Sequence, residues 1–246
     1  MALVGIGADL EGIHAVEAAV DAGRVTGLTA ERRRAKGEDV ARIIRKAAEA
    51  GASIEYVDDV RDLATTGAPQ GVVARARPIQ SIALKQAAKL NDNPALLVLD
   101  HVEDPRNIGA AARSASAAGM TALVVSQHRS APIGATAFKA AVGTLEHLPI
   151  VVVSSIAEAL SRLSKLQLWT VGLDGNGTDS LFGNELLSRP VAVVVGAEGK
   201  GLSRLVGERC DVVATIPMVG EAESLNASVA SALACFEVAR MRGWVS

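Results

Sequence analysis

Aromatic residues are scarce in this chain, because Phe, Trp and Tyr together make up only 2% of its 246 residues. Modules that bind single-stranded nucleic acid usually stack bases on exposed aromatic side chains, so the composition argues against that class. The formal net charge of −2 argues against a protein that coats nucleic acid by bulk electrostatics, since that mode needs a strongly basic surface. Any contact with nucleic acid must therefore be local.

Cysteine is also rare, and the few histidines are scattered. Cys210 and Cys235 lie in apolar or strand-like stretches, which favours buried, unreactive thiols over a disulfide framework. The histidines lack the paired spacing of a zinc site, so we expect no metal. No apolar run reaches the roughly 20 residues of a membrane span, and no basic segment precedes the short apolar stretch at residues 1–7. We expect a cytoplasmic protein without membrane association.

The chain does have enough apolar sequence for a packed core. Hydrophobic residues make up 49% and charged residues 21%, a globular balance, and the length favours a small domain followed by a larger one. We expect the small domain at residues 1–76, a linker at 77–93 and the larger domain at 94–246. Apolar periodicity predicts an α/β arrangement for the small domain. Its predicted helices cover residues 11–22 and 40–47, and its predicted strands cover 25–30, 53–57 and 71–74.

The larger domain alternates short apolar strands with helical stretches. Continuous apolar strands of this kind are typical of a parallel sheet that helices cover on both faces. The last helix, near residues 226–241, is apolar on nearly every side and must be buried on more than one side, either in the monomer core or at a subunit interface. The predicted strands cover residues 95–99, 121–125, 150–153, 166–171, 191–195 and 211–216.

Three loops that follow predicted strands carry polar residues, at the sheet edge where ligand sites gather in parallel folds. The first, Glu103-Asp-Pro-Arg-Asn-Ile-Gly-Ala-Ala-Ala-Arg113, opens a helix. Asn107 lies near the start of that helix, where its ordinary role is an N-cap. Arg113 lies about two turns further along. Taken alone, these residues describe a capped helix with a solvated arginine.

The second loop, Gly196-Ala-Glu-Gly-Lys-Gly-Leu202, is rich in glycine, which allows positive φ angles and a close approach of backbone to a ligand. Glu198 is thereby held on a tight turn. The Gly-x-x-Gly-x-Gly spacing is the reverse of the dinucleotide fingerprint, and Lys200 is followed by glycine rather than by the Ser or Thr of a phosphate-binding loop. Taken alone, this loop is a structural turn.

The third loop runs from Thr215 to Asn226, between a predicted strand and the apolar last helix. Pro217 ends the strand because it has no N–H donor. Ser224 or Asn226 can cap the helix that follows. What capping does not explain is the presence of polar residues at all three strand ends together.

Read in order, the three loops resemble the motifs of the SpoU (TrmH) group of the SPOUT superfamily, which are RNA 2′-O-methyltransferases. The matching segments are Glu103 to Arg113, Gly196 to Leu202, Ile216-Pro-Met and Ser224-Leu-Asn226, with Gly143 to Pro149 as a further family-like stretch. Gly12 to Ala19 and Gln70 to Ala74 resemble the L30-like RNA-binding domain of the bacterial 23S rRNA guanosine 2′-O-methyltransferases. The resemblance covers nearly the whole chain.

The resemblance implies a fold that the residue patterns alone do not give, since threaded chains are almost absent from proteins. It implies a small L30-like α/β domain followed by a SPOUT α/β-knot domain, whose mostly parallel sheet is trefoil-knotted. It also implies a homodimer that packs around the final helix, with 23S ribosomal RNA as the substrate.

S-adenosylmethionine is the cofactor that the resemblance implies, without a metal. The implied cofactor-binding residues are Gly196, Ile216, Met218, Leu225, Gly201 and Thr144. The implied catalytic residues are Arg113, Asn107, Glu198, Ser224 and Asn226. Arg113 is expected to stabilise the developing alkoxide or to grip a phosphate, because a guanidinium with a pKa above about 12 is a poor base. Glu198 is expected to orient Arg113.

The densest basic cluster of the small domain is a candidate RNA contact, although such runs are usually solvated surface. It consists of Arg32, Arg33, Arg34 and Lys36. Three alternatives stay open. The chain can be a methyltransferase of tRNA or of another rRNA, including an antibiotic-resistance type, or a non-catalytic RNA-binding ribosome-assembly factor of the same fold. A nucleotide-dependent oxidoreductase is the third, and the reversed glycine spacing argues against it.

Overall fold

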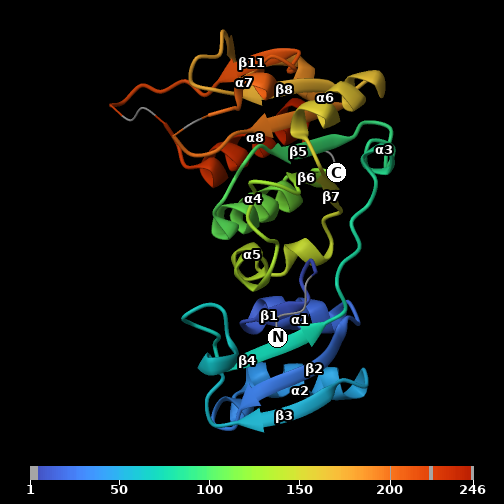
Figure 1. The fold of residues 1–246 in the computed structure, drawn as a ribbon, viewed down its shortest axis with the longest axis vertical. Coiled ribbons are helices and arrows are strands. Elements are labelled where there is room, and N and C mark those ends of the chain that lie inside the picture. The colour runs from blue at the N-terminus through green and yellow to red at the C-terminus, as the bar shows by residue number, and fades with distance from the viewer. Residues whose placement is uncertain (1–4, 200, 222–223, 245–246) are drawn as a thin grey trace. The chain divides into compact units, whose positions relative to one another are not determined.

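The computed structural model of the chain describes residues 5–199, 201–221 and 224–244. Lys200 and residues 222–223, which belong to two of the loops singled out above, lie outside them. The described residues form two compact units. The first unit contains residues up to Gln80 together with Pro132–His147, and the second contains Ser81–Ala131 and the residues from Leu148 onward. Each unit has its own sheet, so each is described by itself (Figure 1).

The first unit is a four-stranded sheet with helices packed on it. Its elements are β1 (Asp9–Glu11), α1 (Ile13–Asp21), β2 (Val25–Glu31), η1 (Arg34–Lys36), α2 (Glu38–Glu49), β3 (Ser53–Val57), η2 (Arg61–Leu63), β4 (Val72–Ala76), α5 (Ala135–Ala141) and η3 (Thr144–Glu146). The strand order is β1-β4-β2-β3, in which β4 pairs antiparallel with both neighbours and β2 pairs parallel with β3. The α/β arrangement predicted from the apolar spacing is confirmed.

Ion pairs join the two longest helices of the first unit. Arg42 of α2 lies 2.8 Å from Oε1 of Glu17 in α1, and Lys46 lies 2.8 Å from Oδ1 of Asp21. The hydrogen bond from Arg42 holds the pKa of Glu17 below its ordinary value. Because the apolar faces of both helices are buried, these ion pairs lie at the polar edge of the contact between α1 and α2.

The second unit is a seven-stranded sheet of order β7-β6-β5-β10-β8-β11-β9, in which every pair is parallel. Its elements are α3 (Leu84–Ala87), β5 (Ala95–Leu99), α4 (Pro105–Ala117), β6 (Ala122–Ser126), β7 (Ile150–Val153), α6 (Ile156–Lys165), β8 (Trp169–Leu173), β9 (Asp179–Ser180), η4 (Glu185–Ser188), β10 (Val191–Val195), α7 (Arg204–Gly207), β11 (Val212–Thr215) and α8 (Ala227–Met241).

Apolar strands explain why helices cover both faces of this sheet. Every residue of β5 and β10 is buried, so neither face of these strands can be left to solvent. Helices α4 and α8 pack closely together on one face, and α3, α6 and α7 cover the other (Figure 1). The parallel sheet with helices on both faces is confirmed.

Some elements differ from the predictions. The sequence pattern missed β1 and β9, which are three and two residues long and too short to show a period. The predicted linker contains α3, whose Leu84 and Ala87 are buried in the core of the second unit. The strand expected to start at residue 166 starts at Trp169, because Leu166 and Gln167 end α6. Among the described residues, no helix combines the length and apolarity needed to span a bilayer.

Candidate active site

The carboxyl ends of three neighbouring strands in the second unit open into a pocket of about 580 Å³. Leu173, Val195 and Thr215 are the last residues of β8, β10 and β11, and all three line the pocket. Loops converge at this edge of a parallel sheet, which is why ligand sites form there. The volume lies within the roughly 300–1,000 Å³ that is usual for small-molecule sites.

The glycine-rich loop after β10 forms one wall of this pocket. The Gly201 N–H donates to the carbonyl of Ala197 at 3.0 Å, so the loop turns back on itself. A Cβ on Gly196 would overlap the carbonyl group of Gly201, and Gly201 itself has a φ of +63°. Both positions therefore require glycine. The tight turn predicted for this loop is confirmed, and it places Glu198 on the pocket wall.

The segment between β11 and α8 lines the same pocket. Ile216 and Leu225 are half-buried there, whereas Ser224 is exposed and Met218 is 39% exposed. The described parts of the second and third sequence motifs thus meet in one place. The structure brings together most of the residues expected to hold a cofactor, namely Gly196, Gly201, Ile216, Met218 and Leu225.

A further wall comes from the loop after β8, which sequence reasoning missed. Asp174, Gly175 and Asn176 line the pocket. The Asp174 carboxylate accepts hydrogen bonds from the N–H of Leu202 at 3.2 Å and from the N–H of Asn176 at 3.0 Å. This carboxylate ties the β8 loop to the glycine-rich loop. The signal was present, because Asp-Gly-Asn-Gly directly follows an apolar strand at the same sheet edge.

The Glu198 carboxylate joins the three sequence motifs. Its Oε1 accepts hydrogen bonds from Asn107 Nδ2 at 2.6 Å, from the Ala227 N–H at 3.3 Å and from Asn226 Nδ2. Asn226 Nδ2 also donates to Oδ1 of Asn107 at 3.1 Å. Asn107, Glu198 and Asn226 therefore form a closed hydrogen-bonded triangle at the start of α4 and α8.

The N-caps of α4 and α8 show whether Asn107 and Asn226 cap these helices. Asp104, not Asn107, is the N-cap of α4, because its Oδ1 accepts the Arg106 N–H at 2.8 Å. The N-cap role considered for Asn107 was wrong, since Asn107 lies inside the helix with its side chain on Glu198. Asn226 does cap α8, accepting the Ser228 N–H at 2.8 Å. Asn226 thus acts as a cap and as part of the triangle.

Arg113 and Thr144 lie outside the residues that line this pocket. Arg113 is exposed on α4 and makes no hydrogen bond or ion pair with another described residue. The expected contact with Glu198 is not formed within the described part of the chain. Thr144 belongs to the first unit, where its hydroxyl donates to the carbonyl of Ala141 at 2.8 Å.

The basic cluster of the first unit is exposed. Its members lie in and just before η1, after β2 (Arg32, Arg33, Arg34 and Lys36). Arg32 lies 3.5 Å from Asp58 in a pair that is open to solvent, which contributes little to stability. The side chains of the other three make no hydrogen bond or ion pair with the described residues, so their charges are free to meet an anion.

Neither Cys210 nor Cys235 is among the described residues that line the pocket. Burial raises the pKa of both thiols to about 12, with Asp211 and Asp100 adding to the shift at Cys210. A thiol that stays protonated is a poor nucleophile and metal ligand. Cys235 is buried, as expected, whereas Cys210 is only half-buried. Within the described ranges, no group of His, Cys, Asp and Glu side chains is placed to hold a metal ion.

Two family models match the chain on either side of α3. Residues 94–236 match the SpoU rRNA Methylase family, and residues 10–82 match RNA 2′-O ribose methyltransferase substrate binding. The chain belongs to the SpoU rRNA methylase family. The first match contains all the loops that line the pocket, so the resemblance carried by the three motifs is confirmed.

Similar proteins include two relatives named as RNA methyltransferases and a solved structure of a SpoU methyltransferase. The chain is 40% identical over 194 residues to the 23S rRNA (guanosine-2′-O-)-methyltransferase RlmB of Escherichia coli, covering 78% of each chain. It is 38% identical over 205 residues to the putative TrmH family tRNA/rRNA methyltransferase YacO of Bacillus subtilis, covering 81% and 82%. The SpoU methyltransferase AviRb from Streptomyces viridochromogenes, solved with AdoMet, matches with a TM-score of 0.79 at 26% identity, covering 95% and 89%.

Proposed function

We propose that the chain transfers the methyl group of S-adenosylmethionine to a ribose 2′-hydroxyl of 23S rRNA, on a guanosine. The observation that carries this proposal is that the glycine-rich loop and the segment before α8 line the same pocket, in a chain that belongs to the SpoU methylase family. The Escherichia coli relative, named for 23S rRNA guanosine, supports the substrate. The Bacillus subtilis relative, named for tRNA or rRNA, makes tRNA the second candidate.

The residues of the pocket fit this cofactor. Asp174 and Glu198 line the pocket, and none of its described lining residues is basic, which suits a ligand with a sulfonium and an ammonium group. Ile216 and Leu225 offer apolar surface to the adenine, and the glycine at 196 lets backbone groups reach the ligand. These residues would hold the cofactor, which supplies an activated methyl group when it is bound.

The chain itself must align the ribose oxygen and help to remove its proton. The triangle of Asn107, Glu198 and Asn226 braces the loops, so that the pocket wall keeps its shape when RNA binds. A guanidinium is a poor base, so the role of Arg113 is to stabilise the developing negative charge on the ribose oxygen or to grip the neighbouring phosphate. Its exposed guanidinium, which pairs with none of the described residues, is available for that contact.

We expect Arg113→Ala to lower the rate of methyl transfer by about 100-fold, the usual loss when one charge-stabilising donor is removed. The dissociation constant for S-adenosylmethionine should stay unchanged, because Arg113 does not line the cofactor pocket. Single-turnover assays and calorimetric titration measure the two quantities. Arg162→Ala, at an exposed arginine of α6, is the matched control and should change neither. Equal losses of turnover and cofactor affinity in Arg113→Ala would contradict the assignment.

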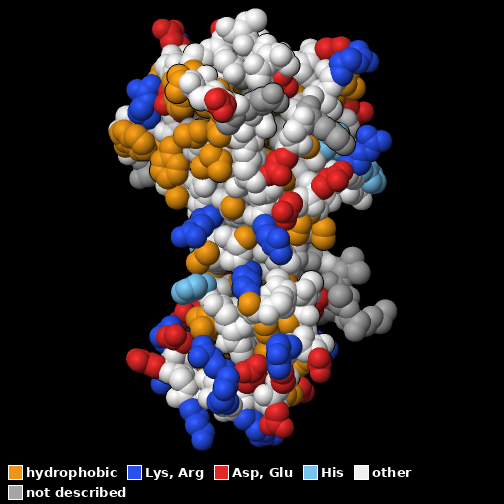
Figure 2. Space-filling model, turned by 90° about the vertical axis from the view of Figure 1, so that its left-hand side faces the viewer, with side chains coloured by type: hydrophobic (Ala, Val, Ile, Leu, Met, Phe, Trp, Pro, Cys, Tyr) orange, Lys and Arg blue, Asp and Glu red, His pale blue; other side chains and the backbone are white. Residues whose placement is uncertain are grey.

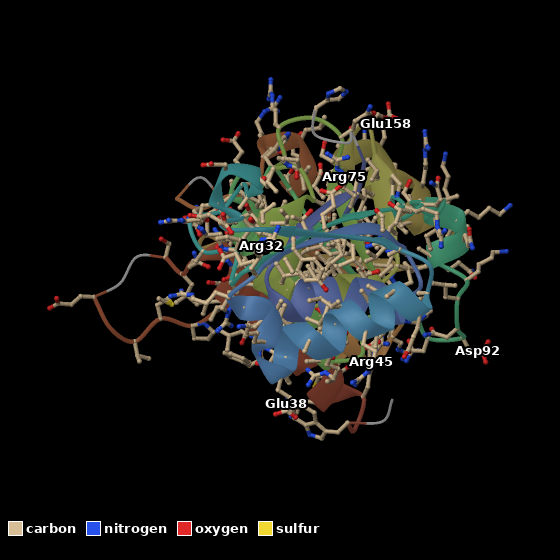
Figure 3. The ribbon with its side chains drawn as sticks, turned by 90° about the horizontal axis from the view of Figure 1, so that it is seen from below. Arg32, Glu38, Arg45, Arg75, Asp92 and Glu158 are labelled. Atoms are coloured by element: carbon tan, nitrogen blue, oxygen red, sulfur yellow. The ribbon has the colours of Figure 1, made fainter. Side chains whose placement is uncertain are left out.

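The first unit is the proposed RNA-binding part, through the basic cluster at η1. Figure 2 shows many Lys and Arg side chains over this unit. Figure 3 shows Arg32 apart from Arg45, which points outward from α2. Neutralising Arg33, Arg34 and Lys36 together should weaken RNA binding and lower the slope of log affinity against log salt by about 2, at roughly 0.7 per phosphate contact. Arg45→Gln is the control, and an unchanged slope in the triple variant would contradict the role.

We also propose a homodimer that packs around α8, a trefoil knot in the second unit and a cytoplasmic location. One face of α8 is buried within its own unit, yet Val229 and Phe236 on the other face are 46% and 42% exposed. The Phe236 ring lies 6.4 Å from that of Trp244, which extends the apolar surface. Exposed apolar surface of this kind is typical of subunit interfaces. Light scattering on the purified protein measures the oligomeric state.

Mapping of 2′-O-methyl groups in cells with and without this protein tests the proposed function. We expect one guanosine of 23S rRNA to lose its methyl group when the protein is absent, and to regain it when the purified protein and S-adenosylmethionine are added. Loss of a methyl group from tRNA instead supports the second candidate. Unchanged methylation of both RNA classes contradicts the proposal.

A further inference from the structure

A second pocket, of about 700 Å³, adjoins the first within the second unit. Residues that follow three neighbouring strands, β6, β5 and β10, line it, together with the start of α4. Ala197, Glu198 and Gly201 line both pockets and therefore form a shared wall. A molecule in the second pocket would lie directly beside the cofactor pocket.

Two residues of this second pocket hold a backbone conformation that favours glycine. His101, after β5, has a φ of +58°, and Arg129, after β6, has a φ of +54°. The two loops are joined by a hydrogen bond from the Ala131 N–H to the carbonyl of Val102 at 3.1 Å. Left-handed backbone at residues with long side chains is unfavourable, and such residues concentrate at sites where the side chain has a function.

A buried carboxylate lies next to His101. The Asp100 side chain is fully buried, and its Oδ2 accepts the Ser203 N–H at 2.8 Å. Its Oδ1 has no well-aligned hydrogen bond among the described residues and lies 2.8 Å from Nδ1 of His101. Because a buried acceptor needs a donor, the His101 imidazole is the group that can satisfy it. Nδ1 is then committed to Asp100, and Nε2 is left for a ligand.

Arg129 supplies the charge that an RNA ligand requires. Its guanidinium is exposed at the pocket and makes no hydrogen bond or ion pair with the described residues. Guanidinium groups bind phosphate through two parallel N–H bonds. The second pocket therefore offers one group suited to phosphate and, in His101, one group suited to a ribose hydroxyl.

We propose that the second pocket holds the acceptor ribonucleotide of the RNA, with Arg129 on its phosphate and His101 Nε2 on its ribose, while Asp100 positions the imidazole. This assignment rests on the proposed function, because it supplies a place for the hydroxyl that receives the methyl group. It explains why the chain keeps His and Arg at two positions whose backbone favours glycine. The shared wall at Glu198 brings acceptor and cofactor together.

His101→Gly removes the proposed ribose contact, and Arg129→Gln removes the proposed phosphate contact. Glycine adopts a φ of +58° without strain, which offsets part of the cost of leaving the buried Asp100 Oδ1 without its donor, so the His101→Gly variant should remain folded with a melting temperature close to or below that of the wild type. Its affinity for a 23S rRNA fragment without cofactor, and its kcat/KM for that RNA, should fall by up to about tenfold, the loss expected for one hydrogen bond. Arg129→Gln should lower both in the same way. The dissociation constant for S-adenosylmethionine should not change in either variant.

Gln167→Gly is the matched control. Gln167 is exposed after α6, has a φ of +65° and lines neither pocket. It should show the same relief of strain with unchanged RNA affinity and kcat/KM. Nuclear magnetic resonance gives a direct test of binding. The imidazole signal of His101 is identified as the one that is missing from the His101→Gly spectrum, and in the wild-type protein it should shift when guanosine 5′-monophosphate is added.

Several outcomes overturn the assignment. One is that His101→Gly and Arg129→Gln show the same RNA affinity and kcat/KM as the control Gln167→Gly. Another is that guanosine 5′-monophosphate does not move the imidazole signal of His101. A loss of RNA affinity in His101→Gly with wild-type affinity in Arg129→Gln would show a structural role for His101 instead. If the wild type transfers no methyl group but the His101 signal moves, the proposed function fails and the nucleotide pocket stands.

Discussion

Glu198 is the residue at which the three motif loops meet. An ionised carboxylate only accepts hydrogen bonds, and this one takes donors from Asn107, Asn226 and the Ala227 backbone on a single oxygen. Its partners come from the starts of two different helices, so one side chain fixes the distance between them. Asn107 is largely buried, so its amide relies on Glu198 and Asn226 for its hydrogen bonds.

Glu198→Ala should lower the free energy of unfolding by about 1–3 kcal/mol, because it leaves the buried Asn107 amide without its acceptor. It should also weaken S-adenosylmethionine binding, because Glu198 lines the pocket. Glu198→Gln keeps an acceptor oxygen and should lose less of both. Denaturant unfolding and calorimetric titration give the two quantities. A Glu198→Ala protein as stable as wild type would show that the triangle does not brace the loops.

Helix α8 begins at the pocket, and its cap belongs to the site. Asn226 ends the third motif, caps the helix and donates to the Glu198 carboxylate. Ser155 caps α6 in the same manner, accepting the Glu158 N–H at 3.3 Å, but α6 lies on the other face of the sheet and does not line the cofactor pocket. The two caps are therefore a matched pair.

Asn226→Ala and Ser155→Ala should each lower the free energy of unfolding by about 0.5–2 kcal/mol through the lost cap. Only Asn226→Ala should also reduce methyl transfer and S-adenosylmethionine affinity, because only that cap contacts Glu198. Thermal unfolding and a methyl-transfer assay on both variants give the comparison. Similar activity in the two variants would contradict a role for Asn226 in the site.

The elements that could be predicted from sequence are those with strong periodicity. The runs at 95–99 and 191–195 are apolar throughout and became the central strands β5 and β10. Asn107 was not predictable in the same way, because its partner Glu198 lies 91 residues away and no local pattern encodes that bond. Asp174 was missed although its strand was predicted, since Asp-Gly-Asn-Gly has the composition of an ordinary turn and the contact that ties it to the site is with Leu202, 28 residues away.

At the scale of the whole molecule, the strand order is what assembles the pocket. β8, β10 and β11 are neighbours in the sheet, and β5 and β6 continue the row, so loops from distant parts of the chain meet at one edge. Parallel strands and helical coverage follow from the apolar runs. The order of the strands depends on long-range packing, which the sequence pattern does not contain. The family motifs pointed to the function because they lie in the loops that line the pockets.

Titration of S-adenosylmethionine into the wild-type protein and two glycine variants tests the cofactor pocket most directly. The wild type should bind the cofactor, and Gly196→Ala should bind it at least about tenfold more weakly, because a Cβ at that position overlaps the carbonyl group of Gly201 and opens the loop. Gly207→Ala, in open space on α7, should bind like wild type. A wild-type protein that does not bind S-adenosylmethionine, or a Gly196→Ala protein that binds it equally well, would contradict the pocket.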